Sequence, residues 1–144
     1  MVFFHIDKQR RLKNRIKERL HFAHYLKNHF DEKDHLPANH ERIMKSISIA
    51  ESDESAFKKL FNEPMPQQLK KGLQVELGMW IYLRNILDRL STGELSDNAF
   101  KEKASKLKGY LKLLVRTIEI EIEILYSPLV YYYERELSAI SRRI

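Results

Sequence analysis

Residues 69–90 read LKKGLQVELGMWIYLRNILDRL and carry apolar side chains on more than one helical face. Steps of three and four residues connect a first stripe, which consists of Leu73, Leu77, Trp80, Leu83, Leu87 and Leu90. The same steps connect a second stripe, which consists of Val75, Met79, Tyr82 and Ile86. A helix that is apolar on two faces has to be enclosed by other elements and cannot lie on a surface. The stretch therefore predicts a buried central helix near residues 67–91.

The composition of the chain favours an all-α bundle of five or six helices. The 144 residues include four Gly and four Pro, which disfavours the many turns of a β architecture. A chain of this length typically forms one domain and buries roughly 68–70% of its unfolded surface. We therefore predict a single helical domain over residues 1–144. The absence of Cys excludes disulfides, thiolate metal sites and cysteine nucleophiles.

Breaks in the apolar period place the other helices. We expect a first helix from about Asp7 to Asp31 and a short second helix near residues 43–50. The run ESDES at residues 51–55 predicts a solvated turn before a further short helix. Gly93 follows the last apolar residue of the central helix and suits a left-handed cap, after which Ser96 or Asp97 begins the next helix.

The segment from residue 118 to residue 133 admits two interpretations. Residues 118–124 alternate strictly between Ile and Glu, which is typical of a half-buried strand that pairs with residues 129–133 in a hairpin. We prefer two helices, because Ser127 and Pro128 suit the N-cap and first turn of a last helix.

On the helical interpretation, the end of this long helix and the residues after it present more apolar surface than one bundle face requires. A surplus of this kind often marks a contact with another chain. The residues that we assign to a partner or self-association interface are Ile120, Ile124, Tyr131, Tyr132 and Tyr133.

The whole net charge of +6 lies in one short segment. Residues 8–19 contain seven cations and one acid, Glu18, so the remainder of the chain sums to zero. These cations are Lys8, Arg10, Arg11, Lys13, Arg15, Lys17 and Arg19. They cover every face of the predicted helix except its apolar stripe, which suits contact with nucleic-acid phosphates, an acidic lipid surface or an acidic partner. The alternative interpretation is a solvated helix face, which is what most charge runs form.

The sequence contains no catalytic signature, because it lacks a Gly-rich phosphate loop, a nucleophile elbow and a clustered carboxylate pair. His21 and His24 have a workable spacing for metal ligands, but two ligands do not make a site. We therefore assign no catalytic residue, no metal and no cofactor.

One short segment of the central helix, Arg84-Asn85-Ile-Leu-Asp88-Arg89, resembles the start of the Arg-Asn-x-x-x-x-His element of HEPN-type helical ribonucleases. In that family an Arg and a His at the dimer seam of a helical bundle act on RNA. No His follows His40 in this chain, so the resemblance implies at most a degenerate ribonuclease. The other interpretation is an ion pair between Arg84 and Asp88, four residues apart on one helix.

Together these features predict a non-enzymatic helical module that binds another macromolecule, first of all a protein or a second copy of the chain. The alternative is binding of RNA, DNA or acidic lipid through the basic first helix. The chain has no apolar run of 18 residues and its amino terminus does not fit a secretory signal. We expect a cytoplasmic protein without a transmembrane segment, although a secreted effector would show the same pattern.

Overall fold

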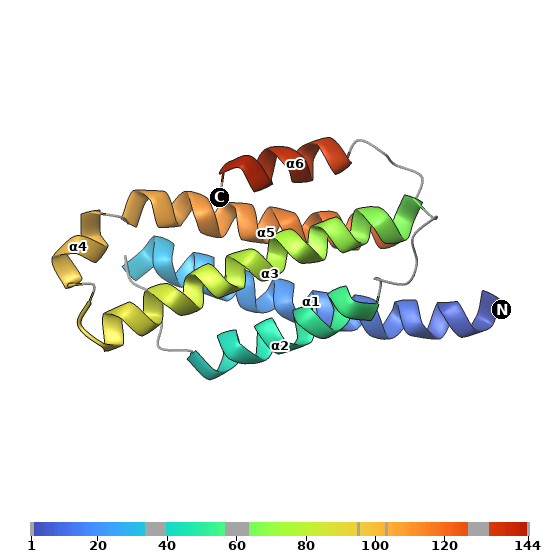
Figure 1. The fold of residues 1–144 in the computed structure, drawn as a ribbon, viewed down its shortest axis with the longest axis horizontal. Helices are drawn as coiled ribbons and strands as arrows, with labels where there is room; N and C mark the ends of the chain where they lie inside the picture. The colour runs from blue at the N-terminus through green and yellow to red at the C-terminus, as the bar shows by residue number, and fades with distance from the viewer. Residues whose placement is uncertain are drawn as a thin grey trace.

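The computed structural model is all-α over the residues that it describes, which are 2–33, 40–56, 64–94, 96–102, 104–126 and 133–143 (Figure 1). Six helices occupy these ranges, namely α1 (Val2–Lys33), α2 (His40–Ala56), α3 (Pro64–Ser91), α4 (Asp97–Glu102), α5 (Ala104–Tyr126) and α6 (Tyr133–Arg143). None of the described residues belongs to a strand. The predicted all-α bundle is confirmed.

Four long helices form the body of the bundle. α5 packs against both α1 and α3, α3 also packs against α2, and α6 covers part of α3 and α5. The short helix α4 contacts α5. The N-terminal end of α1 extends past the neighbouring ends of α2 and α3 (Figure 1). This end of α1 therefore projects from the bundle.

The central helix is α3, and its enclosure is confirmed. Met79, Trp80 and Leu83 have no exposed surface, and Val75 and Ile86 of the second stripe are buried as well. Because α2, α5 and α6 all pack on α3, this helix needs more than one apolar stripe to contact all three neighbours.

The alternating Ile and Glu residues are helical, so the hairpin interpretation is wrong for residues 118–126. Ile118, Ile120 and Ile124 are all fully buried, because α5 lies between α1 on one side and α3 and α6 on the other. A helix with neighbours on several sides needs apolar residues at positions that a single stripe does not include. The alternation therefore reflects multiple packing partners.

Two predicted boundaries in the first half of the chain are wrong. α1 begins at Val2 and not at Asp7. α2 continues through residues 51–56, where a solvated turn was expected. The polar run was expected to face solvent, but Asp53 is 2% exposed and forms ion pairs with Arg15 and Arg19 of α1. This buried contact lets α2 continue through the run. The short helix predicted after residue 56 lies outside the described residues.

The predicted caps between α3 and the next helix are confirmed. Gly93 has a φ of 80°, in the left-handed region that glycine adopts without steric cost. The Ser96 hydroxyl accepts a hydrogen bond from the Ala99 N–H at 3.1 Å, as an N-cap does.

Candidate functional site

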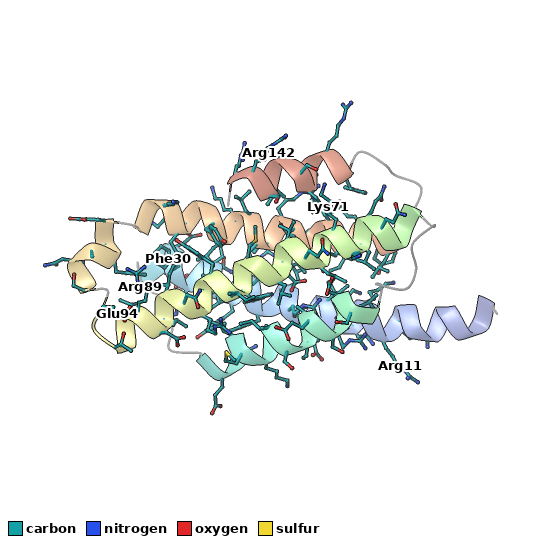
Figure 2. All side chains as sticks on the ribbon, viewed as in Figure 1. Arg11, Phe30, Lys71, Arg89, Glu94 and Arg142 are labelled. Carbon is teal, nitrogen blue, oxygen red and sulfur yellow. The ribbon has the colours of Figure 1, made fainter. Side chains whose placement is uncertain are left out.

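The basic segment of α1 divides into an exposed group and a buried group. The side chains of Arg10, Arg11 and Lys17 are exposed, and Lys13 is half-buried. Arg11 points away from the bundle (Figure 2). The side chain of Lys8 lies outside the described part of the structure.

Arg19 belongs to the interior and not to the surface, which corrects its assignment as a polyanion contact. Its side chain is 2% exposed, and its Nη1 lies 2.9 Å from Oδ2 of Asp53. Its Nε donates a hydrogen bond to Oε2 of Glu76 at 2.5 Å, and its Nη2 donates to Oε1 of the same carboxylate at 3.2 Å. Arg15 donates from Nε to Oδ1 of Asp53 at 2.8 Å, although its side chain remains 41% exposed. Two of the seven cations are therefore engaged by the protein itself.

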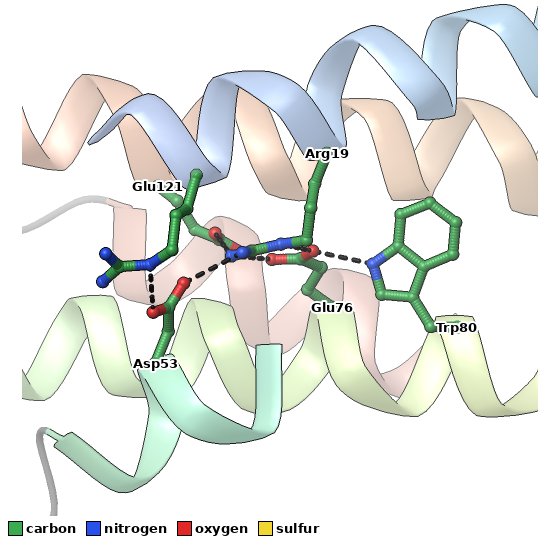
Figure 3. A network of polar contacts seen from close by, with 6 residues as sticks. Arg19, Asp53, Glu76, Trp80 and Glu121 are labelled. Atoms are coloured by element: carbon green, nitrogen blue, oxygen red, sulfur yellow. Dashed lines mark hydrogen bonds and ion pairs between the residues drawn. The ribbon is translucent and has the colours of Figure 1, made fainter. Parts of the chain in front are cut away.

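The buried network joins four helices around the Arg19 guanidinium (Figure 3). Asp53 comes from α2, Glu76 from α3 and Glu121 from α5. The indole N–H of Trp80 donates to Oε2 of Glu76 at 2.7 Å, so this carboxylate has donors from two helices. A buried charge of this kind persists only when it is paired and hydrogen-bonded, and Glu76 meets both conditions.

Glu121 is the member of the network with the poorest partners. It has no exposed surface, Nη2 of Arg19 lies 3.8 Å from its Oε1, and neither of its oxygens has a hydrogen-bond donor. Burial and the negative charge of Glu76 raise the pKa of Glu121 well above its ordinary value, against the opposing effect of Arg19. A protonated Glu121 has an O–H to share with Glu76, and this hydrogen bond raises its pKa further.

The network is neutral when Glu121 carries its proton. Burial acts to lower the pKa of Arg19, but the charges of Glu76, Glu121 and Asp53 outweigh it and raise that pKa. Arg15 and Arg19 therefore balance Asp53 and Glu76. This arrangement holds the helices together, and it leaves the more N-terminal cations of α1 to face solvent.

A signal for the network is present in the sequence, although our prediction missed it. Along α1 the apolar steps of three and four residues run through Ile16, Arg19 and Ala23, so Arg19 occupies a core position. Glu76 likewise stands between Leu73 and Trp80 in the first stripe of α3. A charged residue at the period of an apolar stripe indicates a buried ion pair, but the period alone does not name its partners.

Tyr126 lies beside the exposed cations and was not assigned to any site. This last residue of α5 is 63% exposed, and Nζ of Lys13 lies 3.8 Å from the centroid of its ring. Hydrogen bonding and charge from Lys13, followed by those from Lys17, lower the pKa of the Tyr126 hydroxyl. The structure thus places an aromatic ring from α5 next to the cationic side chains of α1.

The residues predicted to form a partner interface do not offer the expected surface. Ile120 and Ile124 have no exposed area and Tyr133 is 6% exposed, because α5 and α6 use them for packing within the bundle. The prediction that they project away from the core is wrong. Tyr131 and Tyr132 lie outside the described residues.

The remaining candidates from the sequence are Arg84 and the histidine pair His21 and His24. Arg84 lies on α3 and donates to Oδ1 of Asn85 at 3.4 Å in an exposed position. His21 and His24 are exposed, and the described residues include no group of three or more His, Asp and Glu arranged to hold a metal ion. Among the described helices, none has a stretch both long and apolar enough to cross a membrane.

Comparison with protein-family models, with curated proteins and with solved structures finds no match for this chain. Its function therefore has to be inferred from the site itself.

Proposed function

We propose that this protein is a binding module that attaches to the phosphate backbone of a nucleic acid through the exposed cations of α1. The observation that carries the proposal is the exposure of the Arg10 and Arg11 side chains. Both are exposed, and neither forms an ion pair with any carboxylate among the side chains that the structure describes, which in α1 begin at residue 10. Arg11 points away from the bundle (Figure 2). Both cations are therefore accessible to a polyanion without breaking an ion pair among those side chains.

The spacing of the exposed cations suits a nucleic-acid strand. With a rise of about 1.5 Å per residue, Arg10 and Lys17 are separated by roughly 10 Å along the helix axis. Successive phosphates of one strand advance by about 3.4 Å along the axis of a duplex, so this length spans about four phosphates. Arg10, Arg11, Lys13 and Lys17 together supply enough charge for that number of contacts.

A nucleic acid is favoured over a lipid surface because α1 buries its apolar stripe from Leu12 to Phe30 in the bundle. Leu12, Ile16 and Leu26 are at most 3% exposed and pack in the bundle core. A helix that lies in a membrane interface inserts such a face among the acyl chains, and its cations add to that insertion. This part of α1 therefore offers its cations for electrostatic contact and keeps its apolar stripe inside the bundle.

The test is binding of a fluorescent single-stranded oligonucleotide, measured by anisotropy over a series of salt concentrations. If four cations contact phosphates, log K falls with log salt with a slope of about −3 for a single strand. Affinity then drops about 50-fold between about 50 and 200 mM salt. The double variant Arg10→Glu/Arg11→Glu should weaken binding at least about tenfold at the lower salt concentration and halve the slope.

The matched control is Lys106→Glu/Lys112→Glu, which lowers the net charge by the same amount on exposed positions of α5. This control should bind like the wild type. Equal weakening by both double variants would mean that only net charge matters, and it would overturn the α1 site. Absence of salt-dependent binding by the wild type would overturn the proposal, as would anisotropy and co-sedimentation data in which vesicles of anionic phospholipid bind more tightly than the oligonucleotide.

A further inference from the structure

Tyr126 is the most exposed of the large apolar side chains in the described part of the chain. It is 63% exposed, compared with 44% for Tyr25 and 38% for Met44. Other aromatic rings are used in the core, where Phe22 stacks on Trp80 at 5.6 Å and Tyr82 lies 4.3 Å from Tyr110. Tyrosine is enriched at binding interfaces because it combines an apolar ring with a polar hydroxyl group.

The surroundings of Tyr126 are cationic. Nζ of Lys13 lies 3.8 Å from the ring centroid, and Lys17 stands one helical turn further along α1. The ring therefore lies against Lys13, one of the cations that would contact phosphates. Since Lys13 occupies one side of the ring while most of the residue stays exposed, ring surface remains for a second planar group.

The combination of one exposed ring and a short row of cations is how proteins hold unpaired bases. A base stacks on the aromatic ring, and the neighbouring cations contact the flanking phosphates. A duplex cannot use this arrangement without first unstacking a base, which costs a few kcal/mol. An exposed ring at Tyr126 therefore favours a single strand over a duplex.

We infer that Tyr126, together with Lys13 and Lys17, forms a stacking site for an unpaired base, and that the preferred ligand of α1 is a single strand. This inference rests on the proposed function of α1 as a phosphate-binding helix. It adds a residue from α5 to that site and names the class of nucleic acid. Because every base has a π-face, the site selects single strands without selecting a sequence.

The experiment compares two probes that carry the same phosphates. One is a short single-stranded oligonucleotide with bases, and the other is an abasic strand of the same length. Tyr126→Ala should weaken binding of the base-bearing strand by about 5- to 150-fold, the range expected for loss of one stacked base. The same variant should bind the abasic strand as the wild type does. Tyr126→Phe, which keeps the ring, should stay within about twofold of the wild type on both probes.

A duplex of the same length supplies the third arm, in which Tyr126→Ala should have no effect. Because Tyr126 is exposed, its substitution should change stability by less than about 0.5 kcal/mol, which a thermal melt verifies. Unchanged affinity of Tyr126→Ala for the base-bearing strand would overturn the stacking site, and so would equal losses on the abasic probe. Both results leave the cations of α1 intact, whereas loss of the proposed function would appear as absent salt-dependent binding of every probe by the wild type.

Discussion

Replacing Arg19 with methionine is expected to cost about 3–5 kcal/mol of stability, because it leaves buried carboxylates without their cation. Arg19 contacts Asp53 at 2.9 Å and Glu76 at 2.5 Å, and all three side chains are at most 2% exposed. A domain of this size has a total stability of about 5–15 kcal/mol. The substitution should therefore remove about a fifth of it or more.

The assay is thermal and urea unfolding followed by circular dichroism. At about 2–4 °C per kcal/mol, the loss corresponds to a decrease in Tm of about 6–20 °C. The matched control is Arg11→Met, which makes the same change at an exposed position of the same helix. That control should stay within about 0.5 kcal/mol of the wild type.

The pH dependence separates this mechanism from simple loss of packing. Arg19 acts to lower the pKa of Glu121, so its removal lets that pKa rise further and the folded variant binds a proton that the unfolded chain has released at neutral pH. Its deficit relative to the wild type should be largest near neutral pH and should shrink as the pH falls. A deficit below about 1 kcal/mol, or one independent of pH, would refute the conclusion that Arg19 neutralises the buried carboxylates.

Three further predictions concern the same interior and use four substitutions, of which Gly78→Ala is an exposed control. The raised pKa of Glu121 makes the wild type lose stability as the pH rises from acid toward neutral. Glu121→Gln should therefore be increasingly more stable than the wild type over that interval. Denaturant unfolding at several pH values measures the stability difference between the two proteins, and a difference that does not change with pH would contradict the prediction. Gly72→Ala should destabilise by about 1–3 kcal/mol, since its Cβ would lie 3.0 Å from Cγ of Glu121, whereas Gly78→Ala meets nothing within 4 Å and should stabilise by about 0.5–1 kcal/mol. A urea midpoint that rises for Gly72→Ala, as it should for Gly78→Ala, would show that the close approach at Gly72 is not tight. Trp80→Phe should cost at least about 1.5–3 kcal/mol of stability, because it removes the hydrogen bond to Glu76. Unfolding is followed by circular dichroism, since the variant has no Trp left for fluorescence. An unchanged stability would show that this hydrogen bond does not contribute.

The architecture could be predicted because it depends on periodicity, which is a local property of the chain. The stripes through Trp80 and Met79 require neighbours on two sides of one helix, and α3 has them. Gly93 and Ser96 act through their own backbone and side-chain chemistry, so their caps could be predicted too. The alternation of Ile118 to Ile124 misled in part, because a strand and a helix with several packing partners give the same short pattern.

The candidate site could be predicted only in part, since net charge is a property of the sequence and its accessibility is not. The concentration of cations before residue 20 is visible in the sequence, and Arg10 and Arg11 are exposed as expected. The proximity of Tyr126 to Lys13 depends on how α5 lies along α1, so a residue more than a hundred positions away could not be assigned to the same surface.

The sequence by itself determined that this protein is a helical bundle with a central helix and a basic first helix, because helical period and charge are written residue by residue. Only the tertiary structure decided which of those charges are available. Arg19 and Ile16 follow the same period along α1, and Arg19 is buried because Asp53, Glu76 and Glu121 arrive from three other helices to meet it. Ile120 and Ile124 are enclosed for the same reason, since burial depends on neighbours that are distant in the chain.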